Sequence, residues 1–456
     1  MRDPDPGEPR TRLIAPIPNE PDGDSKPILS AGATMAGAGT GRPSGRLVLP
    51  DAPAQTAGRE MNDMTERTLR GKIVIAGIGE TTYYKHGQSP DSEFKLALQA
   101  ILAAARDAGI DPKDIDGFAS YSNDRNDPSR LAAALGSKEL RFSNMQWGGG
   151  GGGVAAAVGN AAAAVATGMA NCVVAFRALA QGQFARFGRG TGAPLASGDD
   201  AFTIPYGVMS PAQKFVMKVV RFMHDHGVKQ EALRAISLAS YHHAQNNPRA
   251  VMHGRPLTEA KYDASRWIVE PFHLFDCCLE NDGAAAVIVM AADRSADLPH
   301  KPSYLLGVAG GSDHRCAAPV HNGPNYPSSH FATVAPNLYA MAALGPKDIG
   351  VVQCYENFTG GVLMSLVEHG FCAPEEANDL LRLENLIAPT GKLPLNTSGG
   401  NLAECYMHGL ELVNEAVRQI RGVSVNQAPR NDAVIVIGGP MVTPVSSLIL
   451  GSEATL

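Results

Sequence analysis

Six consecutive glycines, residues 148–153, form the stretch of this chain best suited to bring backbone N–H groups against a ligand. They follow Trp147 and precede an alanine-rich run that ends at Gly168. Glycine has no side chain to hold a ligand away, and partial positive charge collects where a helix begins. The pattern therefore predicts that backbone groups approach a ligand here, at the N-terminus of a small-residue helix.

The elements that must position this run occur twice in the chain. A Pro-Lys-Asp-Ile segment at Pro112 recurs at Pro346, each time between an alanine-rich helical segment and a hydrophobic strand. The first copy has a strand at residues 73–78, a helix at 96–108, a strand at 117–121, a glycine-rich helix entry at 148–153 and a final strand at 172–176. The second copy has the same order at residues 304–309, 334–344, 351–355, 396–400 and 433–437. Strands that alternate with helices indicate parallel βαβ units, and two copies predict a pseudo-twofold α/β protein.

We divide the chain into four parts. Residues 71–200 and 266–298 form the first half of the repeat, and residues 299–456 form the second. Residues 201–265 are polar with a helical pattern, and we expect an inserted lid that covers a bound ligand. Residues 1–70 contain few large apolar side chains, so we expect a disordered extension or an upstream start codon, with initiation near Met61 or Met64.

Composition excludes several classes of function. With 456 residues, 44% of them hydrophobic, the chain can bury a large core, and its net charge of −6 does not favour nucleic acid or an anionic membrane as a partner. Seven cysteines without a CxxC pair argue against a zinc ribbon or a disulfide scaffold and favour the cytoplasm. No apolar run approaches roughly 18 residues, so no membrane span is expected. No metal site is expected either, because the adjacent His242 and His243 do not share a helix face.

Residues 72–456 resemble the thiolase superfamily, above all the sterol-carrier-protein-x type. In thiolases a nucleophilic cysteine opens a buried helix that ends at a glycine before a short strand, and counting back from Gly168 places Gly151 at that cysteine. Residues 355–358, Tyr-Glu-Asn-Phe, resemble the Asn-Glu-Ala-Phe or His-Asp-Cys-Phe motif. Residues 399–407 resemble the Gly-Gly-x-x-x-x-Gly-His-Pro motif, which places Tyr406 at the catalytic histidine. Val436 stands at the second catalytic cysteine, two residues before Gly438.

The resemblance implies a retained site that has lost its nucleophile. Two tyrosines at such positions resemble the steroid side-chain-cleaving aldolases, which perform a retro-aldol reaction on β-hydroxyacyl-CoA thioesters. The implied fold is α/β, with duplicated βαβαβαββ halves in a five-layered αβαβα core. The implied reaction cleaves a 17-hydroxy steroid side-chain CoA thioester to a ketone and propionyl-CoA. Also implied are a homodimer core, a small zinc-ribbon and OB-fold partner giving a heterotetramer, zinc only in that partner, and no covalently bound cofactor.

A retro-aldol cleavage needs a base for the β-hydroxyl proton, stabilisation of the thioester enolate, and an acid for the α carbon. We assign the first proton transfer to Tyr355 and the last to Tyr406. Because a free phenol has a pKa of about 10, a base role requires a local field, which we expect from helix N-termini at Gly151 and Gly400. The backbone N–H groups of Gly151 and Gly438 are the expected oxyanion hole.

Other residues are candidates for support. His408 lies two residues after Tyr406 and is placed to orient it, although on a helix that offset points to a different face. Asn357 lies in the motif of Tyr355, and Tyr206 lies where the lid would meet a ligand. Three arginines after the strand at residues 172–176 are expected on a loop that meets the phosphates of coenzyme A: Arg177, Arg186 and Arg189.

Two other functions remain open. Cys354 and Cys405 adjoin the two tyrosines, so the chain could be an acetyl-CoA acetyltransferase-type thiolase with a relocated cysteine. It could also be a non-catalytic scaffold for a zinc/OB-fold partner. The pair Cys277 and Cys278, which precedes a strand at residues 284–290, is interpreted as a strand entry rather than a thiol site.

Overall fold

The computed structural model describes residues 68–148, 150–183, 197–313 and 325–456. Most of the expected extension at residues 1–70 lies outside the described residues, and so do Arg186 and Arg189. Among the described segments, no helix combines the length and the apolar character needed to cross a membrane.

The first half of the repeat has the expected order of elements. These are β1 (Ile73–Glu80), α2 (Glu93–Ala108), β3 (Gly117–Tyr121), α3 (Pro128–Leu135), β4 (Phe142–Gln146), α4 (Val154–Ala166), β5 (Cys172–Ala180) and, after the insertion, β8 (Asn281–Ala291). Helix α2 begins where the Ser92 side chain accepts the backbone N–H of Lys95 and ends at Gly109 in the left-handed region. The β1 strand buries most of its residues, as expected for a strand covered on both faces.

The second half repeats this order with one difference. Its elements are β9 (Ser303–Gly311), α8 (Ala335–Ala342), β10 (Val351–Cys354), α9 (Thr359–Glu368), α12 (Leu410–Arg421), β11 (Ala433–Gly438) and β12 (Val445–Gly451). The strand that would match β4 is reduced to one parallel bridge between Val352 and Leu395. The βαβαβαββ pattern is therefore complete in the first half and shortened in the second.

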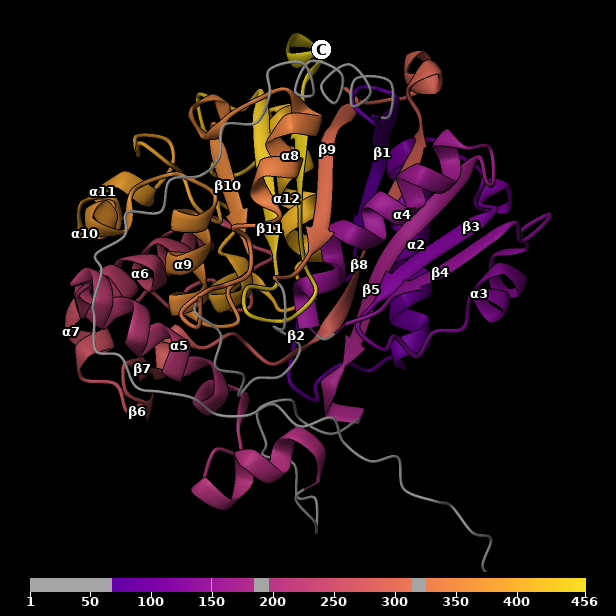
Figure 1. Ribbon diagram of the computed structural model, residues 1–456. Coiled ribbons are helices and arrows are strands. Elements are labelled where there is room, and N and C mark those ends of the chain that lie inside the picture. Colours follow the sequence, from indigo (N-terminus) through magenta and orange to yellow (C-terminus); the bar gives the residue numbers. More distant parts are fainter. Residues whose placement is uncertain (1–67, 149, 184–196, 314–324) are drawn as a thin grey trace, which may run out of the picture. The chain divides into compact units, whose positions relative to one another are not determined.

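The two halves form layers around two inner helices (Figure 1). Ten of the twelve described strands make one sheet in the order β10-β11-β12-β9-β1-β8-β5-β3-β4, with β2 (Tyr84–Lys85) paired to β8. A short antiparallel pairing of β1 with β9 joins the half-sheets. Helices α4 and α12 contact strands of both halves, whereas α2 packs on the first half-sheet and α8 on the second. This arrangement confirms the expected five-layered αβαβα core.

The insertion is helical, as predicted, and packs against the second half. Residues 201–265 contain α5 (Pro211–His226), α6 (Gln230–Asn246) and α7 (Glu259–Asp263). The strands β6 (Trp267–Val269) and β7 (Phe272–His273) follow, in the range assigned to the first half, and pair with each other outside the main sheet. Helices α5 and α6 pack on α9, and α6 also packs on the short helix α11 (Leu383–Leu386), which follows α10 (Ala377–Leu380). The insertion therefore covers the segment that begins at Tyr355 and leads into α9.

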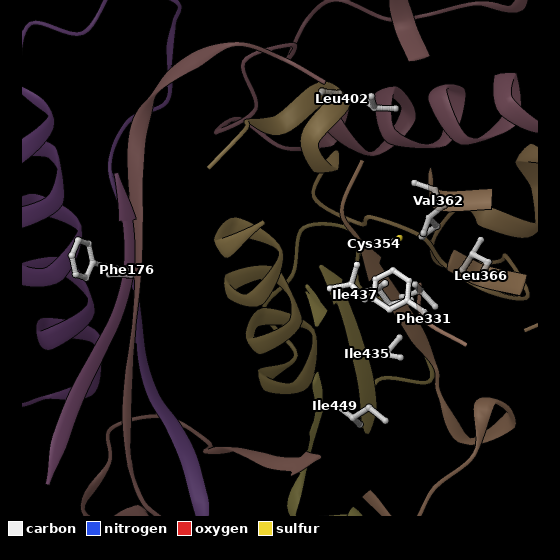
Figure 2. Packing of buried hydrophobic residues seen from close by; sticks show 14 of the residues in the cluster. Phe176, Phe331, Cys354, Val362, Leu366, Leu402, Ile435, Ile437 and Ile449 are labelled. Atoms are coloured by element: carbon white, nitrogen blue, oxygen red, sulfur yellow. The ribbon is translucent and has the colours of Figure 1, made fainter. Parts of the chain in front are cut away.

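Alternation along β10 separates two hydrophobic clusters. Cys354 belongs to the cluster that includes Val362 and Leu366 of α9, here called the outer cluster, and Figure 2 shows it beside Ile437 and Phe331. Tyr355, the next residue, belongs to the other cluster, here called the inner cluster, which also contains Tyr406. The two neighbours in the sequence therefore lie on opposite faces of the second half-sheet.

The segment before α12 differs from the expectation of a helix entry at residues 396–400. Residues Gly400–Glu404 form a π-helical turn, and Cys405 then returns to extended backbone with φ −167°. The long helix starts only at Leu410. Tyr406 and His408 therefore lie on an irregular segment between the turn and the helix, so the helix-face argument against His408 does not apply.

Candidate active site

The ring of Tyr355 occupies the space that a side chain at residue 151 would need. A Cβ atom added to Gly151 would lie 2.2 Å from Cε2 and 2.4 Å from Cδ2 of Tyr355. Gly151 lies in a 3₁₀ turn (Gly150–Gly153) that leads into α4, as the glycine run predicted. Because carbon atoms cannot approach so closely, a side chain at residue 151 and this tyrosine ring exclude each other.

Tyr355 and Tyr406 meet through their phenol groups. Their oxygen atoms lie 2.5 Å apart, and their ring centroids are 5.7 Å apart. Only 1% of Tyr355 and 7% of Tyr406 is exposed. The Tyr355 phenol oxygen also lies beside the glycine turn, since a Cβ atom added to Gly150 would be 3.4 Å from it. The two predicted catalytic residues thus form one buried hydrogen-bonded pair.

Two asparagine side chains hold the backbone on either side of Tyr355. Asn396 bonds both backbone groups of Cys354, accepting its N–H at 2.7 Å and donating to its carbonyl at 2.8 Å. Asn401 accepts the backbone N–H of Glu356 at 2.8 Å, while the Glu356 carboxylate accepts the backbone N–H of Asn401 at 2.9 Å. These reciprocal bonds fix the end of β10 against the π-helical turn, and thereby the direction of the Tyr355 side chain.

Tyr406 is held by the segment that enters β8. Its backbone N–H donates to the side-chain oxygen of Asn281 at 2.7 Å. Cys278 is tied to the other tyrosine's segment, because its backbone N–H donates to the Asn357 carbonyl at 3.1 Å. The strand entry that the sequence analysis treated as structural therefore supplies contacts to both tyrosine segments.

Burial raises the pKa of both phenols. Either oxygen can be the donor of the bond that joins them. Desolvation remains the largest effect for both, so both groups are neutral phenols at neutral pH. The expected lowering of a phenol pKa by a helix N-terminus at Gly400 is not found, because the helix starts ten residues later, at Leu410.

His408 lies beside Tyr406 and is bonded to Arg177. The imidazole and the phenol ring are in edge-to-face contact with centroids 4.9 Å apart. Arg177 donates from Nε to His408 Nδ1 at 3.2 Å and forms an ion pair with Asp124 at 2.7 Å. Arg177 is 3% exposed within β5, so it does not stand on a surface loop where it would meet coenzyme A phosphates.

Three other predicted site residues, Gly438, Asn357 and Tyr206, do not contact the two phenol groups directly. Gly438 packs against the glycine turn, since a Cβ atom there would lie 2.8 Å from the Gly151 carbonyl oxygen. The Asn357 side chain bonds the backbone of Phe358 at 2.8 Å and so shapes the loop rather than facing the phenols. Tyr206 is 82% exposed on a 3₁₀ turn of the insertion, so the structure does not bring it into the buried site.

The thiols named for a relocated nucleophile are shielded. Cys354 faces the outer cluster, and Cys405 is fully buried near acidic groups, so burial raises the pKa of both thiols. Burial also raises the pKa of Cys278 to about 12. Over the ranges that the structure describes, no three His, Cys, Asp or Glu side chains gather to hold a metal ion.

Sequence reasoning missed the residues that orient the tyrosines. Asn281, Asn401 and Cys278 act through contacts between segments more than 40 residues apart along the chain. The only available signal was their position beside the expected motifs, since Asn401 follows the Gly399-Gly400 pair.

Fold and site together define a member of the thiolase superfamily in which a tyrosine ring fills the space of a side chain at residue 151. The family of thiolase C-terminal domain-like sequences matches residues 314–452. The chain is 41% identical over 392 residues to a steroid side-chain-cleaving aldolase of Thermomonospora curvata, covering 84% of this chain and 99% of that protein. It is 38% identical to a 17-hydroxy-3-oxo-4-pregnene-20-carboxyl-CoA lyase of Mycobacterium tuberculosis, covering 84% of this chain and all of that protein. The chain belongs to the steroid side-chain-cleaving aldolases, the carbon–carbon lyases of this superfamily.

Solved structures agree with this placement. The Ltp2-ChsH2(DUF35) aldolase superposes with a TM-score of 0.78 at 39% identity, over 84% of this chain and 99% of the other. Human mitochondrial 3-ketoacyl-CoA thiolase superposes with a TM-score of 0.59 at 16% identity and supports the fold alone.

Proposed function

We propose that the chain cleaves the bond between the α and β carbons of a β-hydroxyacyl-CoA thioester, with a 17-hydroxy steroid side-chain CoA as the substrate class. The products are a 17-keto steroid and propionyl-CoA or a similar short acyl-CoA. The observation on which this proposal depends is that the Tyr355 ring occupies the space that a side chain at residue 151 would need, while the phenol oxygens of Tyr355 and Tyr406 lie 2.5 Å apart. Such a site has proton carriers and lacks a nucleophile at residue 151.

The Tyr355–Tyr406 pair can carry the substrate proton without forming a free phenolate. In one relay, the β-hydroxyl gives its proton to the Tyr355 oxygen, Tyr355 passes its own proton to Tyr406, and Tyr406 at the same time releases its own proton toward the α carbon. As the carbon–carbon bond breaks, its electron pair develops as the thioester enolate, the β carbon becomes a carbonyl, and the α carbon takes up the proton from Tyr406. Each phenol gains one proton and loses one, so both end neutral and no external acid or base is consumed.

The contact between the two phenols supports a relay. Their oxygen atoms lie 2.5 Å apart and either can be the donor, so a proton can pass between them. Burial raises the pKa of both groups, which keeps both protonated at neutral pH, as the relay requires. We assign the β-hydroxyl proton to Tyr355 and the α-carbon proton to Tyr406.

The proposed assembly is a homodimer core with a small partner that carries a zinc ribbon and an OB-fold. The solved relative contains a DUF35 protein with its aldolase, which supports a partner of that kind. Strand β4 ends the sheet order and leaves Met145 46% and Trp147 82% exposed beside it, which supports pairing with a second copy. Zinc belongs to the partner in this proposal, coenzyme A enters only as the substrate's thioester, and the complex works in the cytoplasm.

Product analysis by mass spectrometry tests the proposal, with the chain co-expressed with its DUF35-type partner. A β-hydroxyacyl-CoA should give a carbonyl product without free coenzyme A. Tyr355→Phe and Tyr406→Phe should each lower turnover by about 10²–10⁴-fold while the thermal unfolding midpoint stays close to that of the parent chain. Cleavage only of a β-ketoacyl-CoA, and only with free coenzyme A, would instead establish a thiolase. Full turnover in both variants would refute the assignment of the tyrosines.

A further inference from the structure

His408 is held in an unusual backbone conformation beside Tyr406. Its φ is 53°, in the left-handed region that residues other than glycine adopt rarely. The Tyr121 hydroxyl donates to the His408 carbonyl at 3.0 Å and so holds this conformation. Non-glycine residues kept in this region cluster at functional sites, where the surrounding structure compensates for the strain. The strained residue is in ring contact with a proposed catalytic tyrosine.

The partner of His408 determines which ring nitrogen carries the proton. A guanidinium group only donates hydrogen bonds, so His408 Nδ1 accepts from Arg177 Nε and the proton of a neutral ring resides on Nε2. Rotating the imidazole by half a turn would place a C–H group against the guanidinium and lose this bond. Because the two nitrogens lie on different edges of the ring, the Nε2–H is directed away from Arg177.

Arg177 is itself rigidly held. Its NH1 bonds Asp124 at 2.7 Å and the Tyr121 carbonyl at 3.1 Å, and its NH2 bonds the Ser122 carbonyl at 3.1 Å. Both charged side chains are buried, with exposures of 4% and 2%. A buried Arg–Asp pair has few alternative arrangements, because either charge alone would be strongly destabilised. The pair therefore fixes the ring orientation of His408.

The surroundings of His408 also keep it neutral. Burial, followed by the charges of Arg177 and Arg125, lowers the pKa of His408 well below its usual value. Asp124 faces Arg177 rather than the imidazole, and the aromatic neighbours Tyr121 and Tyr406 are neutral phenols. A neutral imidazole donates a hydrogen bond to an oxygen without giving up its proton, as an imidazolium would.

We propose that His408 is a further catalytic residue, whose Nε2–H donates a hydrogen bond to the thioester oxygen as the enolate forms, and that Asp124 and Arg177 hold it in this tautomer. The inference rests on the proposed lyase reaction. That reaction needs donors for the enolate oxygen, and His408 is in ring contact with Tyr406, one of the two proposed proton carriers. A neutral donor leaves the α carbon, rather than the enolate oxygen, as the site that is protonated.

The tautomer is tested directly by ¹⁵N NMR of the histidine-labelled full chain with its partner, and the His408 signal is assigned by its loss in His408→Gln. We expect an Nε2–H tautomer that persists from pH 6 to pH 8. The Nε2 resonance should shift when a CoA thioester lacking the β-hydroxyl, which cannot react, is added. An Nδ1–H tautomer, a protonated ring in this pH range, or an Nε2 resonance unchanged by the thioester would overturn the inference.

Three variants test the role of the donor in turnover. His408→Ala and His408→Asn should lower kcat by about 10²–10³-fold, the usual effect of removing one oxyanion donor. His408→Gln, whose amide nitrogen can take the place of Nε2–H, should recover at least about tenfold of that loss. Asparagine tolerates a left-handed backbone better than glutamine does, so strain predicts the opposite order.

Equal kcat in the Ala and Gln variants would refute the donor role. Such a result, with carbonyl product still formed by the parent chain, would leave the lyase assignment standing, whereas absence of carbonyl product from the parent chain would remove the lyase assignment itself.

Discussion

Gly151→Ala should disable the site through one added methyl group. The backbone at Gly151 lies outside the left-handed region, so alanine is compatible with its φ. The new Cβ would meet the Tyr355 ring at 2.2, 2.4 and 2.8 Å, all shorter than carbon contacts allow, and the ring would have to move. Overpacking of a buried site costs about 1–3 kcal/mol, and a reacting group displaced by about 1 Å loses roughly 10²-fold in rate.

A double-mutant cycle separates the steric effect from any effect of the turn itself. Tyr355→Ala alone removes a large buried ring and should cost about 3–5 kcal/mol of stability. In that background Gly151→Ala has nothing to collide with, so the two substitutions should be less destabilising together than their sum by about 1–3 kcal/mol. Tyr355→Phe is the matched control, because it keeps the ring and therefore the clash while removing the phenol oxygen.

The assays are kcat with a β-hydroxyacyl-CoA and the thermal unfolding midpoint of each variant. We expect Gly151→Ala to lower both and Gly151→Ala/Tyr355→Phe to show the full loss of stability. Wild-type kcat and midpoint in Gly151→Ala would contradict the placement of the Tyr355 ring. Strictly additive effects in the cycle would show that the alanine harms the turn without touching the ring.

Three further predictions concern the residues His243, Asn281 and Cys278. Burial lowers the pKa of His243 to about 3, so the buried neutral form contributes stability that is complete above about pH 6.5 and is lost as pH falls toward about 3. The difference in the free energy of unfolding between the parent and His243→Gln should therefore shrink by about 2 kcal/mol from pH 7.5 to pH 5. A difference that does not depend on pH would contradict the lowered pKa. Asn281→Ala should lower kcat by about tenfold because it frees the Tyr406 backbone N–H, whereas Asn281→Asp keeps the acceptor oxygen and should recover part of the rate. Cys278→Ala should keep at least about a tenth of the turnover, and no acyl group should be found on Cys278 by intact-protein mass spectrometry, because its raised pKa leaves no thiolate.

Hydrophobic pattern and repeat order predicted seven strands of the sheet, whereas β2, β4 and β12 had no predicted range. Strand β3 was placed to the residue, and the ends of the other six lie within four residues of the structure. These strands are buried on both faces, so each reads as a short apolar run bounded by turn residues. The tyrosines were found in a different way, from the positions that they share with a family motif.

The supporting residues could not be predicted, because their conformation depends on distant partners. A Gly-Gly pair before an apolar stretch is typical of a helix entry, but here the Glu356 carboxylate accepts the backbone N–H of Asn401 and favours a π-helical turn. Arg177 after a hydrophobic strand indicates a surface loop, but the strand continues to Ala180 and Asp124 pairs with the buried guanidinium. In both cases a buried charge meets a partner that local pattern does not reveal.

The glycine at residue 151 and the tyrosine at residue 355 form one structural unit. A tyrosine at residue 355 with a cysteine at residue 151 would place the cysteine Cβ 2.2 Å from a carbon of the tyrosine ring. Loss of the side chain at residue 151 alone, with a smaller residue at 355, would leave a buried void of side-chain size, which is itself destabilising. A tyrosine at residue 355 and a cysteine at residue 151 therefore exclude each other in this fold. The hydrogen bond between the two phenols adds Tyr406 to the same unit, because a substitution of either tyrosine removes that bond from the other.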